Sequence, residues 1–167
     1  MVDLRWVQMM ARYNAWQNES IYAAADKLDD EVRRADKGAF FKSIHGTLSH
    51  ILWADKVWLA RLTGQPANFG TIAQSPMFVE DWETLKSERQ KMDGEITAWA
   101  AAIQDDELSG DFVFFSHAQN AEIRTNRSLC ITHVFNHQTH HRGQVHVLLT
   151  ASGVKPNDTD LPFMPAG

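Results

Sequence analysis

The sequence has little cysteine, and the shortage limits how the fold can be stabilised. Cys130 is the only cysteine among 167 residues, so the chain cannot form an internal disulfide. A lone thiol is typical of proteins from reducing compartments, and we therefore expect a cytoplasmic protein. The shortage also excludes the thiolate-rich sites that usually hold a structural zinc ion.

Long apolar runs and an excess of positive charge are also missing. No run reaches the roughly 20 apolar residues that a membrane-spanning helix needs, and residues 1–16 lack the apolar core of a signal peptide. The formal net charge is -5, and no long basic run occurs. We therefore expect neither a membrane nor a nucleic acid as the partner.

The composition that is present suits a globular protein. A hydrophobic share of 44% and a charged share of 22% are ordinary for a folded domain, and the length is sufficient for a proper core. The sequence shows no internal repeat and no low-complexity segment. We predict a single domain over residues 1–167.

Four long segments carry apolar residues at helical spacing. The predicted helices cover residues 3–28, 43–64, 78–103 and 126–152. Asp3 and Ser43 are suitable N-cap residues for the first two helices, and Gly153 stands where a glycine commonly ends a helix. In the third segment, one step of the apolar seam is filled by Arg89.

The stretches between these helices differ in character. Residues 29–40 are polar and predict a connection, whereas residues 65–76 predict a loop with a short turn of helix. "DFVFFS" and "AEIRTN" predict two short strands of a β-hairpin before the last helix. The whole pattern predicts an all-α four-helix bundle with at least one long crossover connection.

The last predicted helix is unusually rich in histidine, with four in "NHQTHHRGQVH" at residues 136–146. On a helical wheel that takes His133 as zero, His137 falls at about 40° and His141 at about 80°, inside the apolar sector. His133 and His140 lie at the edge of that sector, and His146 points away.

Two interpretations fit an inward pair of histidines. They are core side chains satisfied by hydrogen bonds, or they hold a metal ion. His137 and His141 are four residues apart, so their imidazoles lie on one face and can converge on one ion. Two neutral imidazoles in an apolar core would otherwise need four hydrogen-bond partners, and we favour the metal.

A third ligand must come from another helix. The second predicted helix offers His45 and His50, and the wheel does not decide between them because both lie toward the edge of its apolar arc. Asp55 falls near the centre of that arc. It is either a buried carboxylate paired with a neighbouring side chain or a metal ligand.

Several polar residues are candidates for supporting the ligands. Gln144, at about 20° on the wheel, either orients a ligand or is exposed. His140 is a proton shuttle or a surface residue, and we favour the surface. For Arg142, at about 180°, we favour a salt bridge or a dimer contact over substrate binding. Asn14, Asn18 and Asn136 either support the site or serve as helix caps or surface residues, and we favour the second role for Asn136.

Three stretches together resemble a known family. "YNAWQN", "LSHILWADKVWLARLTG" and "VFNHQTHHRGQVHVLLTASGVKPNDTDL" are similar to the DinB/YfiT-like metalloenzymes of the DinB superfamily, and the resemblance spans nearly the whole chain. It implies a bacterial protein, a four-helix bundle and a homodimer. It also implies three metal ligands, which are the histidine that opens "HILWAD" (His50), that of "NHQ" (His137) and the second of "HHRG" (His141).

Three imidazoles with an open coordination position suit zinc, nickel or a similar divalent transition metal. Such an ion activates water for hydrolysis or holds a thiol as its thiolate. The superfamily includes thiol-dependent transferases and isomerases, so the resemblance favours S-transfer or isomerisation with a small-thiol cosubstrate. A hydrolase and a non-catalytic, metal-stabilised, stress-linked binding protein are the alternatives. The sequence does not identify a catalytic side chain. Gln144 and His140 are the candidates for residues that support the ligands.

Overall fold

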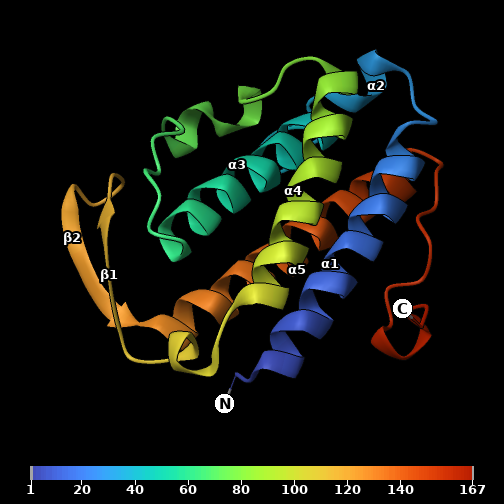
Figure 1. Ribbon diagram of the computed structural model, residues 1–167. Coiled ribbons are helices and arrows are strands. Elements are labelled where there is room, and N and C mark those ends of the chain that lie inside the picture. The colour runs from blue at the N-terminus through green and yellow to red at the C-terminus, as the bar shows by residue number, and fades with distance from the viewer. Residues whose placement is uncertain (1, 167) are drawn as a thin grey trace.

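Four long helices form the body of the protein in the computed structural model, which describes residues 2–166 (Figure 1). They are α1 (Leu4–Ala25), α3 (Ile44–Leu62), α4 (Trp82–Ala102) and α5 (Arg127–Ala151). Helices α4 and α5 each pack against both α1 and α3. This arrangement confirms the predicted helical bundle. No helix within the described residues is both long and apolar enough to cross a membrane.

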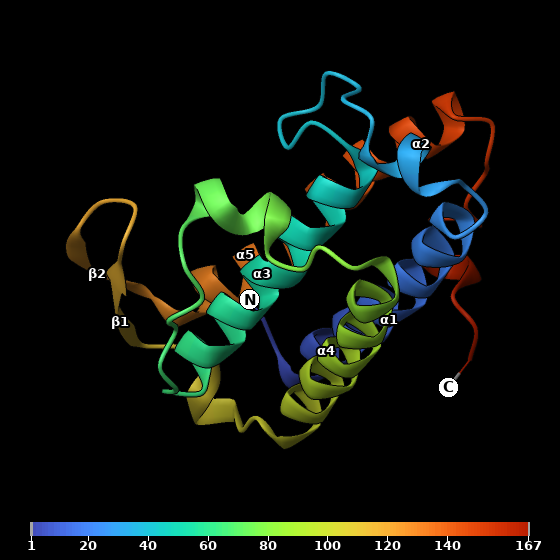
Figure 2. The same ribbon diagram turned by 90° about the horizontal axis from the view of Figure 1, so that it is seen from above.

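The helix directions require a long return of the chain. Helices α1 and α5 run one way, and α3 and α4 run the other way (Figure 1). Because α3 and α4 are parallel and consecutive, the segment 63–81 must run back along α3, and it contains the 3₁₀ helix η1 (Ile72–Met77). Figure 2 shows η1 beside α3, with which it makes extensive contact. The predicted crossover connection lies here.

Shorter elements occupy the other connections. The stretch 29–40, predicted as a connection, contains one short helix, α2 (Asp30–Arg34). Its acidic residues come first and its arginines last, which suits the helix dipole and explains why so polar a stretch is helical. Two further 3₁₀ helices are η2 (Asp105–Leu108) and η3 (Leu161–Phe163).

The predicted β-hairpin is present beside the bundle (Figure 1). Strands β1 (Asp111–Ser116) and β2 (Ala121–Asn126) pair antiparallel, with Phe114 opposite Ile123. Side chains alternate along both strands, so Phe114 and Ile123 are partly buried while Phe115 is exposed. One face of the hairpin therefore lies toward the helices.

The predicted caps hold three of the long elements in place. The Asp3 carboxylate accepts from the backbone N–H of Trp6 at 2.7 Å, and Ser43 Oγ accepts from that of Gly46 at 3.0 Å. Gly153 follows α5 with a φ of 83°, a left-handed conformation that glycine adopts without strain.

A charged cluster lies inside the apolar core, around Arg89, which occupies one of the inward-facing positions of α4. Its side chain is 2% exposed and donates to the Asp55 carboxylate at 2.6 Å. Asp55 also accepts from Gln138, and Arg89 lies 2.9 Å from Asp93. Asp55 is therefore paired locally, as one of the two interpretations expected.

Arg142 corrects one expectation. It forms no salt bridge with any described residue and is buried, donating to Gln138 at 2.8 Å and to Asn14. The predicted salt bridge was wrong, and the side chain is buried because α5 is covered on two sides, by α3 and by α1. A wheel with a single apolar face places such a residue on the surface.

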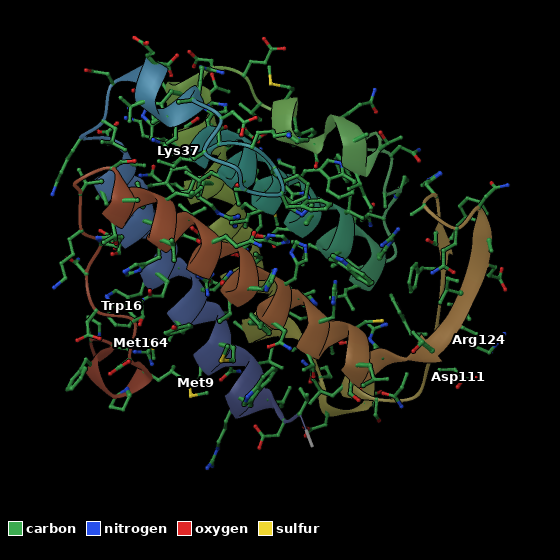
Figure 3. All side chains as sticks on the ribbon, turned by 180° about the vertical axis from the view of Figure 1, so that it is seen from behind. Met9, Trp16, Lys37, Asp111, Arg124 and Met164 are labelled. Carbon is green, nitrogen blue, oxygen red and sulfur yellow. The ribbon has the colours of Figure 1, made fainter. Side chains whose placement is uncertain are left out.

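The C-terminal segment 152–166 lies along α1. Tyr13 donates to the carbonyl of Thr159 at 2.8 Å, Gln17 donates to that of Asp158 at 2.9 Å, and Ser20 accepts from the backbone N–H of Asn157 at 2.8 Å. Figure 3 shows this segment beside α1, with Trp16 and Met164 labelled. The tail is therefore fixed to the first helix by side chains of that helix.

A close backbone approach at Gly46 gives a testable pair of substitutions. A Cβ at Gly46 would stand 2.5 Å from the carbonyl oxygen of Phe41, whereas one at Gly94 would meet nothing within 4 Å. We expect Gly46→Ala to lower the free energy of unfolding by about 1–3 kcal/mol, because the backbone must shift. Gly94→Ala should raise it by about 0.5–1 kcal/mol. Urea denaturation measures both, and effects of the same sign would contradict the expectation.

Candidate metal centre

Three histidines from two helices converge in the structure. His50 comes from α3, and His137 and His141 come from α5, so that one nitrogen of each lies within 4.8 Å of the others. The Nε2 atoms of His50 and His137 are 3.2 Å apart. Two nitrogens that bind one zinc ion tetrahedrally are separated by about 3.4 Å. The cluster could therefore hold a metal ion with small adjustments of the side chains.

Ser75 of η1 fixes the orientation of His50. Ser75 Oγ lies 2.8 Å from His50 Nδ1, and it donates its own proton to the carbonyl of Ile72 at 2.6 Å. Ser75 must then accept from His50, so Nδ1 carries the proton and the lone pair is on Nε2. The ring of Phe41 stacks on His50 with centroids 3.7 Å apart. Both contacts hold Nε2 toward α5.

Gln144 plays the same part for His141. Its Oε1 lies 2.8 Å from His141 Nδ1, and an amide oxygen can only accept. His141 therefore carries its proton on Nδ1 and presents the Nε2 lone pair to the cluster. The amide nitrogen of Gln144 lies 3.2 Å from Nε2 of His140, which is itself exposed. The structure thus places Gln144 beside a proposed ligand and His140 at the surface.

Burial keeps these imidazoles neutral. Burial, with the nearby His141, lowers the pKa of His50 to about 3. Burial and the surrounding histidines lower the pKa of His137 to about 3, and burial also lowers the pKa of His141. Neutral imidazole is the form that binds metal ions. A hydrogen bond between His50 and His137 would engage the nitrogens of only those two rings. A single metal ion would engage one nitrogen lone pair from each of the three.

The other candidate residues lie elsewhere. His45 Nε2 is 2.9 Å from the carbonyl of Val79 and does not join the cluster, so the structure brings His50 to the α5 pair. His133 packs edge-on against Trp58, with ring centroids 4.9 Å apart, beside the cluster. His146 faces a different pocket, next to α1.

Ser75 and Phe41 are the functional positions that sequence reasoning missed. Both lie in connections, where no periodicity indicates which side chain points inward. The only sequence signal near Phe41 is Gly46, a glycine in the first turn of a helix, which indicates a close approach of another segment.

A pocket of about 600 Å³ opens beside the cluster. It lies between α3, α5, the hairpin and the segment that leads into η1, and His137 and His133 form part of its wall. Its remaining wall is mostly apolar and aromatic, with Trp53, Trp58 and Phe114 as the largest side chains. A small molecule could reach the histidines from this side.

The fold and the cluster define a helical-bundle protein with a site that could hold a metal ion. The family model described as "DinB family" matches residues 2–167, and the chain belongs to this family. The resemblance that the motifs indicated is thereby confirmed.

Two relatives agree with this assignment. The chain is 24% identical over 152 residues to "Protein DinB" of Bacillus subtilis (strain 168), covering 89% of this chain and 87% of that protein. It is similar to the crystal structure of a DinB-like protein from Bacillus cereus ATCC 10987, with a TM-score of 0.63 and 22% identity. That likeness covers 86% of this chain and 90% of the other, and it shows the shared fold.

Ser75→Ala tests the orientation of His50. The variant removes the acceptor for His50 Nδ1 while leaving every proposed ligand in place. We expect the affinity for Zn²⁺ to fall by about 10–100-fold, the usual effect of losing a partner behind a ligand. Competition with a chromophoric chelator measures the affinity. Ser87→Ala, at an exposed serine of α4, is the control, and equal affinities for the two variants would contradict the assigned role.

Proposed function

We propose that the protein is a metal-dependent enzyme in which His50, His137 and His141 hold a divalent transition metal with an open coordination position. Its proposed reaction is S-transfer or isomerisation with a small-thiol cosubstrate. The observation that carries this proposal is the convergence of three neutral imidazoles, two buried and one half-buried, beside a pocket large enough for a small molecule. Zinc and nickel both suit such nitrogen ligands.

The residues around the cluster support this reading. A divalent ion at the site would lower the pKa of a thiol or water that it binds. Ser75 and Gln144 hold two imidazoles with Nε2 directed inward, and the stacked ring of Phe41 covers His50 from solvent. His137 also lines the pocket, so a molecule bound there would lie next to a proposed ligand.

Two alternatives remain, a hydrolase and a non-catalytic, metal-stabilised protein linked to stress. Among the described residues, no carboxylate joins the cluster, and the buried Asp55 is engaged by Arg89. A metallohydrolase that assists its bound water with a carboxylate base would need one from elsewhere, whereas coordination alone deprotonates a thiol. This difference favours the thiol chemistry. From the family resemblance and the single cysteine, we also propose a homodimer in the cytoplasm.

Cobalt substitution tests the open position. We would load the protein with one equivalent of Co²⁺, add β-mercaptoethanol and record the absorption spectrum. A new near-ultraviolet band from sulfur-to-cobalt charge transfer is the expected result. If Co²⁺ binds and neither thiol nor pH alters its spectrum, the enzyme proposal fails and the non-catalytic alternative stands. If no divalent ion binds, both fail.

A further inference from the structure

Arg61 carries a charge that no carboxylate neutralises. Its guanidinium lies over the rings of Trp58 and Phe114, at 4.8 and 4.5 Å from their centroids, and donates to the carbonyl of Phe115 at 3.2 Å. It forms no salt bridge with any residue between 2 and 166. Partial burial lowers the pKa of Arg61, because the charged form loses water. No carboxylate of the described chain offsets that loss.

Two other buried arginines are held by side chains, and a third arginine, Arg127, lies over a ring as Arg61 does but does not line the pocket. Arg89 is paired with Asp55 and Asp93, and the buried Arg142 donates to two side-chain amides. The partner that Arg61 lacks would have to come from outside the chain. Stacking on two aromatic rings holds its planar group in one orientation, and a guanidinium so held can bind a carboxylate through two parallel hydrogen bonds.

Arg61 lines the same pocket as His137. His50 and Arg61 both belong to α3 and are three helical turns apart, or about 16 Å along the axis. The wall between them is apolar, formed by Trp53, Val57 and the inward side chains of the hairpin. The pocket thus has the Arg61 cation toward one end, with His133 beside Trp58, and His137 of the cluster toward the other end.

We propose that this pocket binds an organic carboxylate with an apolar, preferably aromatic, body. Its carboxylate pairs with Arg61, its body lies against Trp58 and Phe114, and its other end points toward the histidine cluster. As a statement about the substrate, the inference rests on the proposed function. The binding of a carboxylate in the pocket depends only on the pocket and Arg61, and it requires no metal ion.

Paired probes test the inference by isothermal titration calorimetry. Phenylbutyrate and phenylbutanol share an apolar body and differ in charge. We expect the carboxylate to bind at least roughly tenfold more tightly, because a charged hydrogen-bonded pair contributes more than a neutral one. Arg61→Gln should abolish the difference, and Arg61→Lys should keep part of it. Thermal unfolding establishes that each variant is folded.

Arg124→Gln is the matched control, since Arg124 lies on the hairpin that contributes Phe114 to the pocket and pairs with Asp111 in an exposed position. It should leave the preference for the carboxylate unchanged. Equal affinity of the wild-type protein for the two probes would overturn the inference, as would a preference that survives in Arg61→Gln. Either result would mean that Arg61 only packs against the rings.

The same titrations separate this inference from the proposed function. The probes are added to metal-free protein, to Zn²⁺-treated protein and to His137→Ala. If Zn²⁺ fails to bind but the carboxylate preference persists, the metal proposal fails and the pocket inference stands. If Zn²⁺ binds and the carboxylate preference is absent, the pocket inference fails and the metal proposal stands.

Discussion

Replacing His137 with alanine should lower the affinity of the protein for Zn²⁺ by at least about 100-fold. Losing a hydrogen-bond partner behind a ligand already costs about 10–100-fold, and His137 is a proposed ligand itself. His50 and His141 would then be left as two ligands from different helices, without the nitrogen that lies 3.2 Å from His50. Elemental analysis and chelator competition on purified protein measure the loss.

Thermal unfolding supplies an independent readout of the same variant. An ion that binds only the folded state raises the unfolding temperature with its concentration. We expect Zn²⁺ to stabilise the wild-type protein and to leave His137→Ala unaffected. His146→Ala is the control, because His146 lies on the same helix but faces another pocket. A wild-type protein without stoichiometric metal under metal-replete conditions would contradict the assignment.

Replacing Arg89 with methionine should lower the free energy of unfolding by about 3–5 kcal/mol. Methionine fills much of the same volume, but the change leaves Asp55 buried beside Gln138 without its cation. Asp93 loses the same partner. Removing one member of a buried ion pair is costly because the remaining charge cannot be hydrated.

The measurement is urea denaturation of Arg89→Met beside Arg124→Met. Arg124 and Asp111 form an exposed pair, so breaking it should change stability by less than about 1 kcal/mol. Similar losses in both variants would mean that the core cluster contributes no more than a surface pair.

The stability of Arg89→Met should also depend on pH. Burial already raises the pKa of Asp55 to about 6, and Arg89 opposes the rise. Without Arg89 the pKa of Asp55 rises further, so the folded state holds a proton that the unfolded state releases. The stability of the variant should therefore fall as the pH rises from about 6, relative to the wild-type protein.

Local sequence signals were sufficient for most of the fold. The helix limits follow from caps such as Asp3 and Ser43, and the hairpin follows from two alternating stretches separated by four residues. Helix α2 was missed because its polar side chains give no apolar stripe. Its stability comes instead from charge order and from Arg33, which lies over the ring of Trp82.

The candidate site could be predicted only in part. His137 and His141 follow from their spacing on one helix, whereas the choice of His50 over His45 needed the family resemblance. The reason lies in α3, whose residues 44–55 are all buried, so no single face of that helix distinguishes inward from outward positions. Ser75 belongs to a connection without periodicity, and only the folded chain brings it to His50.

The position of the last helix and the tail bears on the order in which the chain can fold. Helix α1 packs against α4 and α5, and its polar side chains bind the tail across sequence separations of 137 to 153 residues. Such distant pairings raise the contact order and slow folding relative to bundles of sequential neighbours. During synthesis, which proceeds from the N-terminus, α1 emerges before the other three long helices and completes its packing only when α5 and the segment after it are present.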